Sequence, residues 1–411
     1  MAKLITGKTI VSIDVGTTKI CVLVCQTLDN GACEIIGMGK SPSDGLRKGV
    51  VVDIAKTVMS IKNAVKEAEL MAGMPIESAS VGISGGHIHS CNSHGVVPLK
   101  NGQITAQDVA NVLAAARAIP VPEGQQILHV LPQYFIIDGH ERVQDPLGMH
   151  GIRLEVQAHI ILGSIASVQN LVTCVESSGV KVSDIILEQL ASADAVLSPD
   201  ERQLGVAVLD IGGGTSDLAL YQQGSIRHTM VLPLAGTHFT NDVAVGLRTT
   251  LKDAERIKKE HGMASLNLLG HDELLEVDTV YGEQKQHINK ADLVAILEAR
   301  AVEILTLVHQ DITKHHLEPM MSTGLVLTGG GSLLPGIKEV AEQIFKVPVR
   351  IGHPRVSYIF PESLESPIYA TGYGLLVHMM NRREHDSMDS LTGPLFKRIL
   401  VRMKSWVSDF F

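Results

Sequence analysis

A glycine-rich turn closes the apolar run Gly205-Val206-Ala207-Val208-Leu209-Asp210-Ile211-Gly212-Gly213-Gly214-Thr215, and a second apolar run, Leu218 to Tyr221, follows it. The N-terminal region has the same order of features. A strand is predicted over Thr9 to Val15, the turn Gly16-Thr17-Thr18-Lys19 follows, and the apolar run Ile20 to Gln26 returns. Asp14 and Asp210 occupy equivalent places in the two copies. Repetition of one strand-turn-strand unit predicts a duplicated α/β fold whose two lobes enclose a cleft.

A third glycine turn, Thr328-Gly329-Gly330-Gly331-Ser332, follows a strand predicted over Gly324 to Leu327 and precedes a helix predicted from Leu334. Because glycine has no side chain, the backbone N–H groups of such turns can approach phosphate oxygens closely. The hydroxyls of Thr17, Thr18 and Thr215 would add donors, and Lys19 would add a positive charge. These features together predict a phosphate-binding site at the ends of three strands.

Two carboxylates belong to this predicted site. Asp14 and Asp210, at strand ends in opposite lobes, are suited to a hydrated magnesium ion, which keeps several waters and takes few protein ligands. A single Asp-x-Gly-x-Thr turn is more often a plain hairpin, but a matched pair with a third glycine turn favours phosphate binding. The Gly-x-x-x-x-Gly-Lys-Ser/Thr pattern of the commoner phosphate loop does not occur in the sequence.

Composition limits the class of protein. A chain of 411 residues is too long for one core, and with 45% apolar but only 3% aromatic residues the core must be aliphatic, as in sheets covered on both faces. The net charge of -9 gives no general attraction for nucleic acid. The five cysteines lack zinc-type spacing, so free thiols in a reducing compartment are expected. No signal peptide or membrane span is predicted.

Further elements follow from helical spacing and turn residues. A helix is predicted over Ile54 to Met71, ending at Gly73-Met74-Pro75. The glycine, histidine and proline content changes between Ser84 and Ile160, which indicates an inserted subdomain with a short helix at Ala106 to Ala118. Helices dominate from Phe239 to Gly262 and from Lys290 to His316, and the polar segment Asn381 to Gly393 is predicted to be a linker.

The three turns resemble the two phosphate motifs and the adenosine motif of the actin, Hsp70 and sugar-kinase superfamily. Glu188-Gln189-Leu190-Ala191-Ser192-Ala193 and Ala370-Thr371-Gly372-Tyr373-Gly374 resemble its two connecting, hinge-forming helices. The resemblance implies an actin-like, ribonuclease H-like fold with ATP and Mg²⁺ in the cleft between the lobes. The residues implied to bind the nucleotide are Asp14, Gly16, Thr17, Thr18, Lys19, Asp210, Gly212, Gly213, Gly214, Thr215, Gly329, Gly330 and Gly331.

Within that superfamily the sequence is most similar to the bacterial FtsA cell-division family, from about Thr9 to Phe411. Asp145 to Val156 resembles the subdomain inserted in that family, and Asp253 to Lys258 resembles its segment near the adenosine, where Glu255 and Lys258 would reach the ribose or base. The resemblance implies head-to-tail filaments, a membrane tether for filaments of the tubulin-like protein FtsZ, and recruitment of later division proteins at midcell. It also implies that the FtsZ tail binds within Leu232 to Arg300, with Arg300 as candidate contact; the alternative is a solvated arginine.

The expected domain boundaries follow from these assignments. Lobe 1 is expected at 1–84 and 162–204 with a closing helix at 359–380, and the α+β insertion at 85–161. Lobe 2 is expected at 205–231 and 302–358, its outer subdomain at 232–301, the linker at 381–393 and a terminal helix at 394–411.

The terminal helix can be argued from spacing alone. At about 100° per residue the apolar side chains fall within about 160° and a basic face lies opposite. Four cations beside Trp and Phe suit the surface of an anionic membrane, and these charges forbid a spanning orientation. The alternative is docking on the protein's own core. The apolar face comprises Leu395, Phe396, Ile399, Leu400, Met403, Trp406, Val407, Phe410 and Phe411, and the basic face Lys397, Arg398, Arg402 and Lys404.

The sequence patterns that would indicate catalysis, or metal binding outside the cleft, are weaker. Hydrolysis needs a polar group that orients water, and Glu188 is a candidate, although a hinge role also explains it. His87 with His89, and His315 with His316, are expected to lack the carboxylate or cysteine partner that a metal site needs.

Other functional classes fit the sequence less well. An Hsp70-type chaperone needs a large domain after the ATPase, and a small-molecule kinase has no use for a basic amphipathic terminus. Another membrane-associated actin-like assembly ATPase, such as a pilus-assembly component, remains the alternative.

Overall fold

The computed structural model describes residues 9–27, 33–100, 102–140, 142–271, 273–280, 285–355 and 362–390. The chain forms two compact units, one of Met1–His89 with Ser164–Leu376 and one of Ser90–Gly163 with Val377–Phe411. The predicted terminal helix at 394–411 lies outside the described residues. Each unit is built around its own core.

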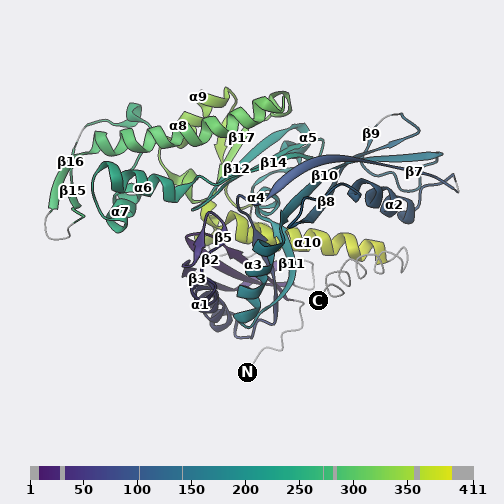
Figure 1. Ribbon diagram of the computed structural model, residues 1–411, viewed down its shortest axis with the longest axis horizontal. Helices are drawn as coiled ribbons and strands as arrows, with labels where there is room; N and C mark the ends of the chain where they lie inside the picture. Colours follow the sequence, from purple (N-terminus) through teal and green to yellow (C-terminus); the bar gives the residue numbers. More distant parts are fainter. Residues whose placement is uncertain are drawn as a thin grey trace. The chain divides into compact units, whose positions relative to one another are not determined.

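Lobe 1 of the first unit is a five-stranded sheet in the order β11-β6-β1-β2-β3. Helices α1 and α3 lie beside strands of this sheet (Figure 1). β1 and β2 pair antiparallel, as do β2 and β3, whereas β6 and β11 run parallel to β1. Helix α1 packs so closely that a Cβ on Gly39 of β3 would lie 1.9 Å from the Ala64 carbonyl oxygen. The bounds are β1 Thr9–Val15, β2 Lys19–Thr27, β3 Cys33–Pro42, β4 Leu46–Arg47, β5 Val50–Val51, α1 Ile54–Ala72, β6 Ser78–Ile83, α3 Ile165–Ser177 and β11 Lys181–Leu187.

Lobe 2 repeats this architecture with the order β14-β13-β12-β17-β18. β12, β13 and β14 are antiparallel neighbours, and β17 and β18 run parallel to β12. The matching order and direction of ten strands confirm the predicted duplication. The bounds are β12 Val206–Ile211, β13 Ser216–Gln222, β14 Ser225–Leu232, β17 Leu325–Thr328, α9 Ile337–Phe345 and β18 Val349–Ile351.

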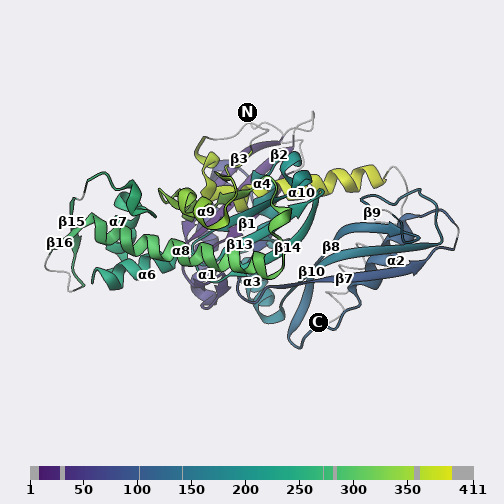
Figure 2. The ribbon, with the colours of Figure 1, turned by 90° about the horizontal axis from the view of Figure 1, so that it is seen from above.

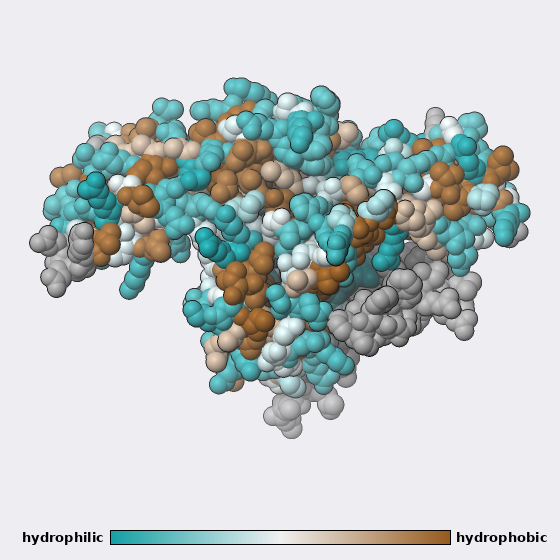
Figure 3. Space-filling view, viewed as in Figure 1, coloured by the Kyte–Doolittle hydropathy of each residue, from teal (hydrophilic) through white to brown (hydrophobic). Residues whose placement is uncertain are grey.

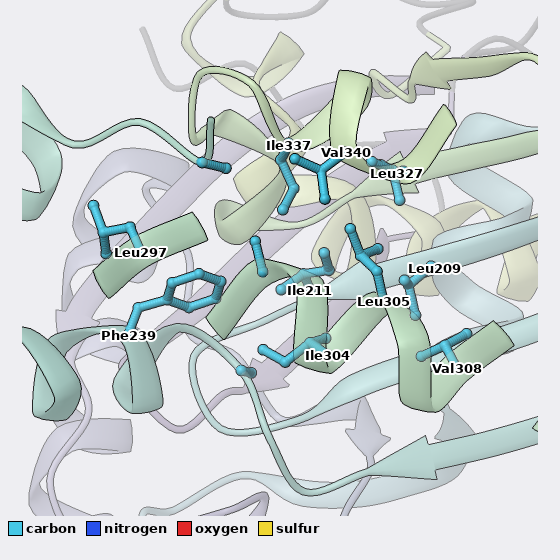
Figure 4. Packing of buried hydrophobic residues seen from close by; sticks show 14 of the residues in the cluster. Leu209, Ile211, Phe239, Leu297, Ile304, Leu305, Val308, Leu327, Ile337 and Val340 are labelled. Carbon is cyan, nitrogen blue, oxygen red and sulfur yellow. The ribbon is translucent and has the colours of Figure 1, made fainter. Parts of the chain in front are cut away.

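The core of lobe 2 lies between this sheet and the long helix α8, Lys290–Lys314 (Figure 2). Leu305 and Val308 of α8 pack beside Leu209 of β12, and Ile304 packs near Ile211 (Figure 4). Their aliphatic side chains agree with the low aromatic content. The outer part of the lobe consists of α6 Gly236–Gly246, α7 Leu251–His261, η1 Leu266–Leu268, β15 Leu274–Asp278 and β16 Lys285–Asn289.

Two helices connect the lobes, α4 at Glu188–Val196 and α10 at Ala370–Ser390, as the family resemblance implied. They touch at a glycine, because a Cβ on Gly374 would lie 1.8 Å from the Ala191 carbonyl oxygen. Helix α10 continues to Ser390, so the expected linker boundary at Asn381 is too early. Glu, Arg and Met are good helix formers, and no glycine or proline interrupts 381–390. The remaining elements are α5 Pro199–Leu204, η2 Glu318–Met320, η3 Gly330–Leu333, η4 Glu362–Glu365 and η5 Pro367–Tyr369.

The second unit contains a four-stranded sheet in the order β7-β10-β8-β9 with helix α2. Thr105 and Asp108 form a capping box that starts α2, and Val112 and Ala116 of this helix join Phe135 and Leu154 in a separate core. This agrees with the predicted α+β insertion. The bounds are β7 His89–Pro98, α2 Ala106–Arg117, β8 Gln125–Ile137, β9 Arg142–Val143 and β10 Arg153–Ser164.

Two sequence expectations are corrected. Cys25 is disulfide-bonded, whereas Cys21, Cys91 and Cys174 are free, so the expectation of free thiols is wrong at Cys25. Spacing along the chain does not reveal which residues a sheet brings together. The helix expected from Leu334 begins instead at Ile337, after Pro335-Gly336. None of the helices formed by described residues has the length and apolar character needed to span a bilayer, and the surface seen in Figure 3 carries apolar side chains only in small groups among hydrophilic ones.

Candidate functional site

Asp210 is the penultimate residue of β12 and is held by both connecting helices. Its Oδ2 accepts hydrogen bonds from the Ser192 hydroxyl of α4 at 2.5 Å and from the Thr371 hydroxyl of α10 at 3.0 Å. Burial raises the pKa of Asp210, and the two hydroxyl donors oppose that effect. Sequence analysis placed Asp210 in the site but missed Ser192 and Thr371, although both lie within the quoted helix segments.

Asp14, at the equivalent position in β1, pairs with a lysine. The Lys19 ammonium lies 2.9 Å from Asp14 Oδ2 and 5.2 Å from the centre of the Tyr369 ring. Burial alone would lower the pKa of Lys19, but the Asp14 carboxylate outweighs it and the pKa lies above the usual value. The Lys19 ammonium therefore supplies the positive charge that was predicted for this loop. The negative charge of Asp14 also adds to the raised pKa of Asp210, so the two carboxylates sense each other across the lobes.

Asp217, the second residue of β13, links the lobes. It accepts hydrogen bonds from the Ser84 hydroxyl of lobe 1 at 2.6 Å, the Thr215 hydroxyl at 2.8 Å and the Gln189 amide at 3.0 Å. Burial raises the pKa of Asp217 to about 7, helped by the charge of Asp210 and opposed by the hydroxyl donors. Asp217 was not among the site residues predicted from the sequence, because its partners Ser84 and Gln189 lie 133 and 28 positions away in the chain.

The two phosphate-type loops face each other directly. A Cβ on Gly213 would lie 2.5 Å from the Thr18 hydroxyl, and a Cβ on Gly214 would lie 2.3 Å from the Thr17 hydroxyl. The first turn of α6 supports the second loop, because Gly236 N–H donates to the Gly212 carbonyl oxygen at 3.0 Å. Glycine is therefore required at both positions by close approach, and the predicted residues of both loops meet at one place.

The third turn reaches the same carboxylate. Gly329 has φ +79°, and a Cβ there would lie 2.1 Å from Asp210 Oδ1. Gly331 also lies close to β12, because a Cβ there would be 2.4 Å from the Ile211 side chain. Gly330 begins the short helix η3. The third turn thus meets Asp210 and Ile211 of the second motif, and the first turn meets the glycines of the same motif.

Glu188 is at the start of α4, close to three other carboxylates. Burial raises its pKa well above the usual value, and the charges of Asp14, Asp217 and Asp210 add to the effect. Glu188 also lines a cavity of about 10 Å³, together with Gly82 and Ser84, which is about the space that one water molecule needs. The neighbouring Gln189 has a buried Oε1 without a hydrogen-bond partner among the described residues. Each side chain can therefore hydrogen-bond a water molecule at its own place: Glu188 in this cavity, and Gln189, which is not among the lining residues, through its Oε1.

Glu255 and Lys258 of α7 lie together beside α6. Lys258 Nζ is 2.6 Å from Glu255 Oε2, 2.8 Å from the Thr240 hydroxyl and 3.1 Å from the Gly236 carbonyl oxygen. Burial lowers the pKa of Lys258, and the pKa of Glu255 is also low because hydrogen bonds from Lys258 and Thr240 outweigh its burial. The pair thus contacts the same turn of α6 that supports the second loop.

Arg300 of α8 is engaged in ion pairs. Its Nε and Nη2 lie 2.5 and 2.9 Å from the two carboxylate oxygens of Asp242, and Nη1 contacts Glu303. Its side chain is 20% exposed. Arg300 is therefore ion-paired with Asp242 of α6 and with Glu303, which lies one turn along α8.

The donor set decides which group the site fits. Asp14 and Asp210 are 5% and 7% exposed, and buried carboxylates of this kind need a cation or several donors to be tolerated. Hydrated Mg²⁺ takes few carboxylate ligands, and loop N–H groups, threonine hydroxyls and a lysine are donors for phosphate. The residues present therefore fit a divalent cation together with a phosphate chain.

Comparison with known proteins agrees with this fold. A family model described as cell division protein FtsA matches residues 207–374, and one described as the SHS2 domain inserted in FtsA matches residues 85–162. The FtsA protein of Pseudomonas aeruginosa is 42% identical over the full length of both chains. FtsA of Bacillus subtilis is 40% identical over 89% of this chain and 82% of that protein, and FtsA of Escherichia coli K12 is 37% identical over 99% and 97%.

Solved structures share the actin-like fold at lower identity. The PilM-PilN type IV pilus biogenesis complex superposes with a TM-score of 0.64 and 17% identity, covering 90% of this chain and 98% of the other. MreB5 of Spiroplasma citri bound to ADP superposes with a TM-score of 0.56 and 16% identity, covering 92% and 98%. These likenesses confirm the predicted fold class.

Proposed function

The chain belongs to the FtsA family of cell division proteins, and we propose that it is an ATP-binding, filament-forming member that tethers FtsZ filaments to the inner face of the cytoplasmic membrane. In this proposal it also helps to recruit later division proteins. The observation that carries the nucleotide part is that the first and third turns both meet the second motif, at its glycines and at Asp210, and that Lys19 pairs with Asp14 in the first. The fold shared with an ADP-bound relative supports it.

In this proposal Mg²⁺ is held through water by Asp14 and Asp210, and it neutralises phosphate charge when bound. The loops at Gly16–Lys19 and Gly212–Thr215 bind phosphate, and the turn at Gly329–Gly331 lies beneath the nucleoside. Glu255 and Lys258 are assigned to the ribose or base. Ser192 and Thr371 orient Asp210. These two hydrogen bonds therefore link both connecting helices to a ligand bound at Asp210.

Titration calorimetry tests the nucleotide proposal. The wild type should bind ATP with heat that depends on Mg²⁺, and Asp14→Asn with Asp210→Asn should abolish that dependence, because both anionic ligands are lost. Asp200→Asn, an exposed aspartate on α5, is the matched control and should bind as the wild type does. Unchanged Mg²⁺-dependent binding in the double variant would contradict the proposal.

Turnover is proposed to be weak or absent. Glu188 lines a cavity the size of one water molecule and Gln189 has an acceptor that is unpaired within the described part of the chain, but burial raises the pKa of Glu188 and so favours the protonated form, which cannot accept a proton from water. Phosphate release should therefore be slow, and Gln189→Ala should lower it further without changing ATP affinity. An unchanged release rate in Gln189→Ala would remove Gln189 from this role.

Membrane attachment is assigned to residues 394–411. One amphipathic helix binds reversibly, and a filament that presents many copies raises avidity. The protein should sediment with vesicles containing anionic lipid, more strongly with ATP than without. Trp406→Asp with Phe410→Asp should abolish sedimentation, whereas Ser405→Asp with Ser408→Asp on the polar face should retain more of it. Sedimentation of the Trp406, Phe410 variant at wild-type level would refute the assignment.

Binding of the FtsZ tail is assigned to the outer part of lobe 2, with Arg300 as contact. Since Asp242 and Glu303 already hold Arg300, the tail would have to compete with them. A labelled FtsZ tail peptide should bind the wild type, and Arg300→Glu should weaken binding, whereas Lys338→Glu on α9 should not. Equal binding by both charge reversals would exclude Arg300.

A further inference from the structure

A cluster of two histidines and one aspartate lies on lobe 2, among residues that the nucleotide and membrane proposals do not use. His228 belongs to β14, Asp311 lies in the last turn of α8, and His315, four residues later, is the C-cap residue of that helix. His228 Nε2 is 2.7 Å from Asp311 Oδ2, and His315 Nδ1 is 3.5 Å from Asp311 Oδ1. The two imidazole ring centres are 4.7 Å apart. Sequence analysis expected no carboxylate partner for His315, and that expectation is wrong.

The spacing of these groups suits a metal ion. One ligand atom from each side chain lies within 4.8 Å of the others. Ligands about 2.0 to 2.2 Å from a tetrahedral Zn²⁺ are separated by somewhat more than 3 Å, so small side-chain rotations suffice. His315 Nδ1 also lies 2.8 Å from the Asp311 carbonyl oxygen. Metal binding through that nitrogen would replace this hydrogen bond.

The surroundings allow access to the cluster. The side chains of His228, Asp311 and His315 are 14%, 20% and 44% exposed, so an ion can enter and a water molecule can complete its coordination. The backbone of the cluster is well supported: Val308, one turn before Asp311, packs beside Leu209 (Figure 4), and Ile312 is fully buried. Three ligands are therefore presented on a rigid strand and helix.

We propose that His228, Asp311 and His315 form a binding site for a divalent transition metal, with Zn²⁺ as the probe. Two neutral imidazoles and one carboxylate are ligands for Zn²⁺ and related ions, and they are poorer ligands for Mg²⁺, which prefers oxygen. The bound ion crosslinks β14 to the end of α8, and so it stabilises the sheet of lobe 2 against its covering helix. The competing explanation is a hydrogen-bonded cluster that binds no metal.

Metal titration of the full chain tests the site. After chelator treatment, and with Mg²⁺ present, the wild type should bind one equivalent of Zn²⁺ tightly and show a raised melting temperature. Co²⁺ in its place should give the strong visible absorption of a low-coordinate ion with imidazole ligands. His315→Ala and Asp311→Asn should each lose at least the roughly 10- to 100-fold in affinity that even outer-shell changes cause.

The control is His316→Asn. His316 is exposed, adjacent to the cluster but not part of it, and has φ +55°, which asparagine tolerates. This variant should bind Zn²⁺ as the wild type does. Because His315 is exposed, His315→Ala should remain folded, which circular dichroism checks. Wild-type Zn²⁺ affinity in His315→Ala, or a Co²⁺ spectrum unchanged by it, would overturn the proposal.

Discussion

Three buried aspartates meet where the lobes join, and each is stabilised differently. Asp14 has a lysine, Asp210 has two hydroxyls from the connecting helices, and Asp217 has hydroxyl and amide donors from both lobes. Only the first partner carries a full opposite charge. Burial therefore favours the protonated form of Asp217 and raises its pKa. Protonation of Asp217 should in turn be coupled to folding.

This coupling predicts a pH effect. The pKa of Asp217 rises from the ordinary 3.8 to about 7 on folding, so the folded state holds an extra proton between those values. Its contribution to the free energy of unfolding is fully present below pH 4 and is lost as the pH rises to about 7. Asp217→Asn keeps the shape but cannot titrate. In urea unfolding of the nucleotide-free protein from pH 5 to 8, wild-type stability relative to Asp217→Asn should therefore fall as the pH rises.

The control for the pH effect is Asp200→Asn, whose side chain is exposed and whose replacement should leave the wild-type pH profile unchanged. If the stabilities of wild type and Asp217→Asn keep a constant difference from pH 5 to 8, Asp217 does not titrate in this range and its assignment as a linked proton site fails.

At the scale of elements, the crossing of α4 and α10 is the closest backbone contact between the connecting helices. Gly374 permits it, since a Cβ would lie 1.8 Å from the Ala191 carbonyl oxygen, whereas a Cβ on Gly372 meets nothing nearer than 3.6 Å. Both glycines lie in the first turns of α10. A substitution at Gly374 therefore tests the packing of α4 against α10, and the same substitution at Gly372 tests helix propensity.

Gly374→Ala should destabilise the protein by about 1 to 3 kcal/mol, because the helices must move apart. Gly372→Ala should be neutral or stabilising by up to about 1 kcal/mol, since alanine favours a helix over glycine. Thermal unfolding of both variants measures the difference. Equal melting temperatures for the two variants would show that α4 and α10 can move apart without loss of stability.

Sequence reasoning succeeded for elements whose signals are local. β1 and β12 end in Asp-x-Gly turns, and α1 is capped by Asp53 and closed by Gly73, so their positions follow from nearby residues. It failed for contacts between distant residues. Ser84 reaches Asp217 across 133 positions and Thr371 reaches Asp210 across 161, and only the folded sheet order brings such residues together. The end of α10 was missed because polar residues fit a helix as well as a linker.

At the scale of the whole molecule, the described core of lobe 2 and the described core of the insertion share no residue. Leu154 belongs to the core of the inserted unit and Leu305 to that of lobe 2, and both are fully buried. Replacing either by alanine should cost about 2 to 5 kcal/mol locally. Leu154→Ala should therefore loosen the insertion while leaving the nucleotide site intact, and Leu305→Ala should disturb β12 and the site.

Amide hydrogen exchange and ATP titration together measure this independence. In Leu154→Ala exchange should rise within residues 90–163 and ATP affinity should stay at the wild-type value. In Leu305→Ala exchange should rise in β12 and α8 and ATP affinity should fall, because Asp210 and its loop rest on that core. Leu147→Ala, an exposed position in the insertion, should change neither quantity. A loss of ATP affinity in Leu154→Ala as large as in Leu305→Ala would mean that the insertion is energetically part of the nucleotide-binding unit.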